Sequence, residues 1–172
     1  MKKLILITAF LLALTPFAFC QNTMASPRDS ASGRIDGALV SVNYGSPSVK
    51  GRKIWGKLVP YGKVWRTGAN EATRFSTSKD LIVEDKTLAA GTYAFFTIPG
   101  ETEWTVIFNK TSRQWGAFEY NDKEDALRLQ VSPSKSDSLS ERLNFLVAED
   151  KVVMRWENLA LPIRISAAST AK

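Results

Sequence analysis

The sequence predicts an all-β protein: a single antiparallel β-sandwich, of jelly-roll or immunoglobulin-like type, with one long functional loop. Short runs of alternating apolar and polar residues recur along the chain and are separated by turn residues. Helical periodicity is almost absent. The 172 residues, 44% of them hydrophobic, are enough for one well-buried domain and too few for two.

Residues 1–20 have the layout of a secretory signal peptide. Lys2 and Lys3 precede an apolar run over 4–14, and small residues follow it. Because this run is short for a bilayer span, we expect no integral membrane span. We therefore expect an exported protein, periplasmic or extracellular.

Cys20 leaves two alternatives for the end of this leader. Ordinary cleavage before Gln21 would remove the only cysteine, whereas lipoprotein processing would make it the lipidated first residue. We favour ordinary cleavage because Phe19 is bulky where lipoprotein processing requires a small residue. In both cases the mature domain has no internal disulfide, and its core alone must stabilise it.

The charge balance is mildly basic. The formal net charge is +6, and removal of Lys2 and Lys3 with the leader leaves 21 basic against 17 acidic residues, a net charge of +4. A nucleic-acid-binding protein usually concentrates its basic residues on one face. We therefore expect no nucleic-acid partner, while the oligomeric state stays open.

The domain order follows from composition and alternation. Residues 21–32 are small and polar and predict a flexible lead-in, 33–166 the β-sandwich domain, and 167–172 a disordered tail. Strands are expected where apolar residues alternate or cluster, at 38–44, 73–78, 81–83, 92–98, 104–109, 127–131, 143–147, 152–156 and 161–165. Residues 99–103 form a hairpin turn, 121–127 an acidic turn with a short helical piece, and a serine-rich linker follows Pro133.

Residues 50–73 form the long loop around which the rest of the chain is organised. They hold two of the five tryptophans and many basic residues, and glycines and Pro60 interrupt every period. Such a loop buries little by itself, so it is expected to bind something or to brace the sheet.

Several kinds of catalysis are excluded by composition. The chain has no histidine, and its one cysteine lies in the leader, which removes histidine- and thiolate-based catalysis and the usual zinc or iron ligands. No glycine-rich phosphate cradle is present. We expect no cofactor and no metal; the remaining catalytic candidate is Glu71, which would need a second carboxylate across a cleft.

Ligand binding is better supported than catalysis. Tryptophan side chains offer flat faces for sugar rings, and nearby polar groups can fix orientation. The candidate ligand-binding residues are Lys50, Trp65, Arg66, Asn70, Glu71, Asn109 and Trp115. Two structural interpretations compete: Trp104 and Trp156 are core residues by their strand parity, and Arg66 with Glu71 forms an internal ion pair that pins the loop.

The chain also resembles a bacterial family of exported proteins known as domain of unknown function 2911. The similarity lies in SPSVKGRKIWGKLVPYGKVWRTGANEAT, LAAGTYAFFTIPGETEWTVIFNK, QWGAFEYNDKEDALRLQV and MRWENLALPIRI. It implies an exported, mostly β domain and no established activity. The signature phrases are Trp65–Glu71 and Trp115–Phe118. If the fold brings them together, one cleft would have tryptophan and arginine walls with a carboxamide and a carboxylate inside.

These observations leave three functional hypotheses. The preferred one is binding of a small polar or carbohydrate-like ligand, with Trp65 and Trp115 stacking on it and Arg66, Asn70 and Glu71 orienting it. The second is a carboxylate-dependent hydrolase that acts on glycans through Glu71. The third is a structural envelope protein whose loop braces the sheet without a ligand.

Overall fold

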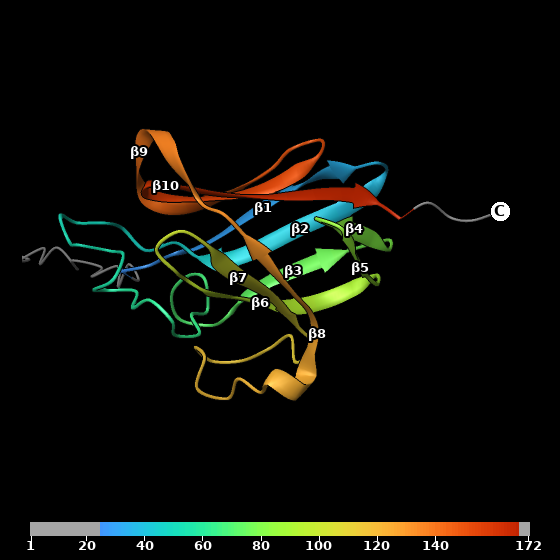
Figure 1. Cartoon of the computed structure of the whole chain (residues 1–172), viewed down its shortest axis with the longest axis horizontal. Coiled ribbons are helices and arrows are strands. Elements are labelled where there is room, and N and C mark those ends of the chain that lie inside the picture. The colour runs from blue at the N-terminus through green and yellow to red at the C-terminus, as the bar shows by residue number, and fades with distance from the viewer. Residues whose placement is uncertain (1–24, 169–172) are drawn as a thin grey trace, which may run out of the picture.

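The computed structural model describes residues 25–168. Its strands form two antiparallel sheets, with β9 and β10 above β2, β3 and β6 in Figure 1. The first sheet has the order β1 (Arg28–Ile35), β2 (Ala38–Gly45), β3 (Thr73–Thr77), β6 (Gly91–Ile98), β7 (Trp104–Asn109) and β8 (Asp125–Val131). The second has the order β5 (Lys86–Leu88), β4 (Leu81–Val83), β10 (Lys151–Ala167) and β9 (Ser134–Val147). The predicted sandwich-like all-β fold is confirmed.

The core lies between the sheets because each strand turns alternate residues inward. On β2, Val40, Val42 and Tyr44 are buried, whereas Ser41 and Asn43 between them are partly exposed and Leu39 before them is exposed. Trp104 on β7 and Trp156 on β10 are almost completely buried, which confirms the parity argument for both. The periodicity of the sequence therefore determines which face of each strand enters the core.

Some element boundaries differ from the sequence-based expectation. Strand β1 begins at Arg28, inside the segment predicted to be a flexible lead-in, because its residues pair along the whole length of β2. Strand β9 starts at Ser134, so the predicted serine-rich linker is strand. The two strands predicted at 152–156 and 161–165 are one strand, β10, which ends at Ala167, within the predicted tail. These residues form strands because they pair with a neighbouring strand, and their local composition does not predict such pairing.

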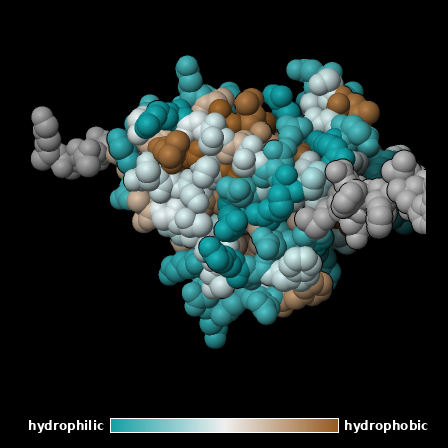
Figure 2. All heavy atoms as spheres, turned by 180° about the vertical axis from the view of Figure 1, so that it is seen from behind, coloured by the Kyte–Doolittle hydropathy of each residue, from teal (hydrophilic) through white to brown (hydrophobic). Residues whose placement is uncertain are grey.

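The short helical piece was predicted correctly. It is the 3₁₀ turn η1 (Asp122–Glu124), capped by the Asn121 side chain, which accepts a hydrogen bond from the N–H of Lys123. Within residues 25–168 no helix is long and apolar enough to cross a membrane. The face seen in Figure 2 is largely hydrophilic, with hydrophobic residues in separate small patches, as is usual for a folded domain surface.

A second, smaller core lies on the outer face of the six-stranded sheet. Ala94, Phe96 and Ile107 face outward from β6 and β7 and are buried beneath Ala117 and Tyr120. The covering residues belong to the segment 110–124, which runs below β6 and β7 in Figure 1. This segment, here called the cover segment, hides only part of the sheet and leaves the outward side chains of β2 and β3 partly accessible.

The long loop is packed against both sheets. Its first residue bonds to β9, where the N–H of Lys50 donates to Glu141 Oε1 over 2.9 Å. Its last part bonds to β6, where the Trp65 N–H donates to the Thr97 carbonyl over 2.7 Å. Trp55 and Trp65 thereby join Trp104 and Trp156 in one aromatic cluster. These hydrogen bonds and ring contacts attach the loop to both sheets.

Candidate functional site

The two signature phrases meet at the end of the long loop. Glu71 and Trp115 form an isolated antiparallel bridge. The Ala72 N–H donates to the Gln114 carbonyl over 3.0 Å, and the Gly116 N–H donates to the Asn70 carbonyl over 3.1 Å. Backbone pairing thus fixes the start of β3 against the cover segment, and a hollow forms beside the junction.

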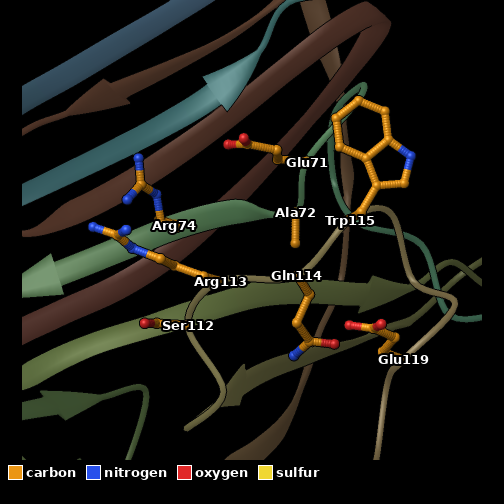
Figure 3. A pocket seen from close by; sticks show the side chains of 8 residues that line it. All are labelled: Glu71, Ala72, Arg74, Ser112, Arg113, Gln114, Trp115 and Glu119. Atoms are coloured by element: carbon orange, nitrogen blue, oxygen red, sulfur yellow. The ribbon is translucent and has the colours of Figure 1, made fainter.

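This hollow, here called the Trp115 pocket, has a volume of about 390 Å³. Its walls come from the end of the long loop, from β3 and from the cover segment (Figure 3). The lining residues are Glu71, Ala72, Arg74, Ser112, Arg113, Gln114, Trp115 and Glu119. Most of these side chains are polar, so the pocket suits a ligand with several hydrogen-bonding groups.

Trp115 supplies the one large aromatic surface of the pocket. Its side chain is 62% exposed, although tryptophan is usually well buried in folded domains. The turn that follows requires glycine: Gly116 has φ +67, and a Cβ there would press on the Phe118 ring. An exposed indole that is held by a backbone bridge is suited to stacking on a flat, partly apolar ligand such as a sugar ring.

Gln114 lies at the base of the pocket and is 5% exposed. Its amide nitrogen donates to Asn109 Oδ1 over 3.1 Å and to the Thr111 carbonyl over 2.7 Å. Its Oε1 is buried and accepts no hydrogen bond from any group between residues 25 and 168. A buried acceptor without a donor is costly, and a ligand hydroxyl could satisfy it.

Charge is distributed unevenly in the pocket. Glu71 is bound to Arg28, whose Nη1 lies 3.0 Å from Glu71 Oε2. Arg74 and Arg113 form no ion pair among the residues the structure describes, and Arg74 Nε is buried without a hydrogen-bond partner there. The pocket therefore contains two arginines whose charge no carboxylate within residues 25–168 neutralises by direct contact.

Two of the residues predicted to bind a ligand belong to the interior instead. Trp65 is 9% exposed and stacks on Trp156, with ring centroids 5.8 Å apart, so its faces are occupied by protein. Asn109 is fully buried; its amide group donates to Asn121 and Asp125 and accepts from Thr111. Neither side chain lines the Trp115 pocket, because Trp65 is packed in the core and Asn109 is hydrogen-bonded inside the protein.

Three other candidates lie outside the walls of the Trp115 pocket. Arg66 is half-buried, and burial lowers the pKa of its guanidinium group. The Arg66–Glu71 ion pair considered from the sequence is wrong, since Glu71 pairs with Arg28. The Asn70 side chain donates to the Ser26 carbonyl over 3.1 Å. Lys50 is exposed at the start of the loop, and its N–H donates to Glu141.

Sequence reasoning predicted only two of the eight lining residues of the pocket, Glu71 and Trp115. Arg74, Arg113, Gln114 and Glu119 were not singled out, and neither was Arg28 as the partner of Glu71. A signal existed for Arg74, which is the polar residue in an alternating strand and therefore must face away from the main core. The position of the cover segment depends on tertiary hydrogen bonds at Asn109, and no local pattern predicts those.

Comparisons with known proteins agree with the resemblance seen in the sequence. The profile of the family described as "Protein of unknown function (DUF2911)" matches residues 26–165, which is most of the chain. Neither the curated proteins nor the solved structures include a significant match. This protein is therefore a member of the DUF2911 family.

Proposed function

We propose that this protein is an exported binding protein that holds a small polar or carbohydrate-like ligand in the Trp115 pocket. The observation that carries the proposal is the convergence, at one hollow, of an exposed tryptophan with an unsatisfied buried acceptor on Gln114. Aromatic stacking with a few directed polar groups is how proteins recognise sugars. Export is supported by the leader at residues 1–20, which lies outside the described residues.

Each wall of the pocket has a distinct role in this proposal. The indole of Trp115 stacks on the apolar face of the ligand. Gln114 Oε1 accepts a ligand hydroxyl, and Glu71, held in place by Arg28, accepts another. The arginines add directional donors on the opposite wall.

A thermal-shift screen of the chain from Gln21 onward tests the proposal, using sugars, cell-wall fragments, amino acids, organic acids and metal ions. At a ligand concentration 100 times Kd, binding stabilises the folded state by about 2.7 kcal/mol, which is a measurable rise in Tm. Trp115→Ala should abolish the rise. The matched control is Phe118→Ala, which removes a neighbouring aromatic side chain that is 86% exposed and does not line the pocket.

The screen also separates the structural alternative. If no compound raises Tm and Glu71→Ala lowers it by many degrees, the junction only braces the fold. If a compound raises the wild-type Tm and leaves a folded Trp115→Ala protein unmoved, a ligand site at the junction is established.

A hydrolase is the second candidate, because Glu119 lines the same pocket as Glu71. Glycoside hydrolysis requires two carboxyl groups on opposite sides of the scissile bond. A hydrolase would release reducing ends from oligosaccharides, and Glu71→Gln and Glu119→Gln would each reduce that rate at least about a hundredfold. Binding without release of reducing ends, in wild type and both variants, excludes this candidate.

A further inference from the structure

A second hollow of about 330 Å³ adjoins the Trp115 pocket on the outer face of the six-stranded sheet. The two share Arg74, Ser112 and Arg113. The second hollow is otherwise lined by Asn43 of β2, Ser76 of β3 and Thr92 of β6. Together they form a groove that passes over the strands, with the arginine pair at its middle.

The two arginines come from the sheet and from the cover segment. Arg74 pairs in register with Asn43 on one side and with Ala94 on the other, so its side chain emerges between a small and a medium-sized neighbour. Arg113 projects from the cover segment toward the same end of the pocket, as Figure 3 shows. Two guanidinium groups that line one hollow repel each other, and an anion between them removes this cost.

The other end of the Trp115 pocket is acidic and aromatic. Glu119 and Trp115 line it, and neither lines the second hollow; Glu71 lies between them and the arginines in Figure 3 and is ion-paired with Arg28. The Glu119 carboxylate repels a negative group from this end and the arginines attract it, whereas a hydroxyl group can donate to Glu119. The groove therefore distinguishes the two ends of a ligand by charge.

The second hollow presents hydroxyl and amide groups. Ser76 Oγ and Thr92 Oγ1 lie 3.0 Å apart and share one hydrogen bond, which leaves lone pairs and a proton for a ligand. Asn43 adds both a donor and an acceptor. An open groove with such a lining fits an extended, hydroxyl-rich molecule better than a single amino acid.

From these observations we propose that the ligand is an anionic saccharide. Its carboxylate or phosphate group lies between Arg74 and Arg113, one sugar ring stacks on Trp115, and a neighbouring unit of the chain extends over Ser76 and Thr92. This inference rests on the proposed binding function and specifies the class of ligand. The guanidinium fork recognises carboxylate and phosphate alike, so the experiment must separate them.

The test is a two-dimensional ¹H–¹⁵N NMR titration of the labelled chain from Gln21 onward. The probes are D-glucuronate, its neutral analogue D-glucuronamide, D-glucose, glucose 6-phosphate and acetate. We expect Kd for glucuronate or glucose 6-phosphate to be at least about tenfold lower than for glucuronamide and glucose, because a charge-assisted pair is the stronger interaction. The tighter of the two anionic sugars identifies the charged group.

Three variants localise the effect. Arg113→Gln, at an exposed position, and Arg74→Gln should each remove the tenfold preference while glucose binding is retained. Arg155→Gln is the control, since it removes the same charge from an exposed position on β10 in the other sheet. It should leave the preference intact.

Failure of this inference differs from failure of the proposed function. Equal affinity for glucuronate and glucose, with shifts at Trp115, overturns the anionic class but keeps a saccharide site. Acetate binding as tightly as glucuronate overturns the saccharide and leaves only an anion site. If none of the five probes shifts any resonance at the pocket, this inference and the binding of simple sugars are both contradicted.

Discussion

At the scale of single residues, Trp65 and Trp115 show how two tryptophans of neighbouring signature phrases acquire opposite roles. Trp65 pairs with Thr97 on β6, and this bridge directs its indole into the aromatic cluster against Trp156. Trp115 pairs with Glu71, on the outer side of the junction, and its indole remains exposed. Composition alone treats the two residues alike, whereas the backbone bridges assign one to the core and one to the pocket.

A matched pair of substitutions tests this division. Trp65→Ala should lower the free energy of unfolding by about 3–5 kcal/mol, because it removes a large buried side chain. Trp115→Ala should change it by less than about 0.5 kcal/mol, because the side chain is 62% exposed. Urea denaturation followed by circular dichroism measures both. Equal destabilisation by the two variants would mean that Trp115 has a structural role.

At the scale of elements, the cover segment owes its position to buried polar contacts. Asn109 bonds to both ends of the segment, through Thr111 and Asn121, and also to the Asp125 carboxylate. That carboxylate accepts further hydrogen bonds, from the Tyr120 hydroxyl over 2.6 Å and from Arg128 over 3.0 Å. The segment therefore has a fixed conformation although it contains little regular secondary structure.

Asn109→Ala should release this segment. The substitution leaves several buried donors and acceptors unpaired, so we expect a loss of about 2–4 kcal/mol of stability. Hydrogen exchange should accelerate first in residues 110–121, while the amides of β2 and β3 keep their protection. Uniform acceleration across the sheet would show that the segment does not depend on Asn109 in the way described.

The junction between the long loop and β2 requires close approach of two backbones. The Ala69 N–H donates to the Gly45 carbonyl over 3.2 Å. A Cβ at Gly45 would lie well inside van der Waals contact of the Ala69 carbonyl oxygen. Only glycine fits there. The lack of a side chain at Gly45 lets the end of the loop approach β2, and this approach positions Glu71.

Gly45→Ala should therefore cost about 1–3 kcal/mol, the usual penalty of inserting a methyl group into a packed site. Ser41→Ala, on the outer face of the same strand, is the control and should cost less than about 0.5 kcal/mol. Thermal unfolding of both variants measures the difference. A Tm for Gly45→Ala equal to that of the control would contradict the close approach.

At the scale of the whole molecule, the sandwich could be predicted because alternation of apolar residues directly encodes which face is buried. Val40, Val42 and Tyr44 on β2 are one example. The serine-rich start of β9 could not be predicted, since its strand conformation comes from pairing with β10. The same limit applies to the site: Glu71 and Trp115 were predicted from their phrases, whereas Arg74 and Arg113 join them only through tertiary contacts.

The fold should also lose stability at alkaline pH. Burial raises the pKa of Tyr44 to about 12, and it raises the pKa values of Tyr93 and Tyr120 as well. In the unfolded chain these phenols ionise near pH 10, so the folded state binds more protons above that pH. The contribution of the protonated phenols to folding stability is therefore complete below about pH 10. It is lost as the pH rises through their folded-state pKa values.

Urea denaturation at pH 8 to 12 measures this dependence. The free energy of unfolding should be flat up to about pH 9.5 and should then fall. Tyr44→Phe should make the decline shallower, because phenylalanine has no proton to lose. A decline of unchanged slope in that variant would assign the alkaline sensitivity to other groups.

The most direct test of the central claim is the indole N–H spectrum of the ¹⁵N-labelled protein during titration with a ligand from the screen. The five tryptophans give five indole signals, and Trp115→Phe identifies the one that belongs to the pocket. Our account predicts that the ligand moves the Trp115 signal in a saturable way and leaves those of Trp65, Trp104 and Trp156 in place. Saturable shifts confined to the buried tryptophans, with Trp115 unmoved, would contradict it.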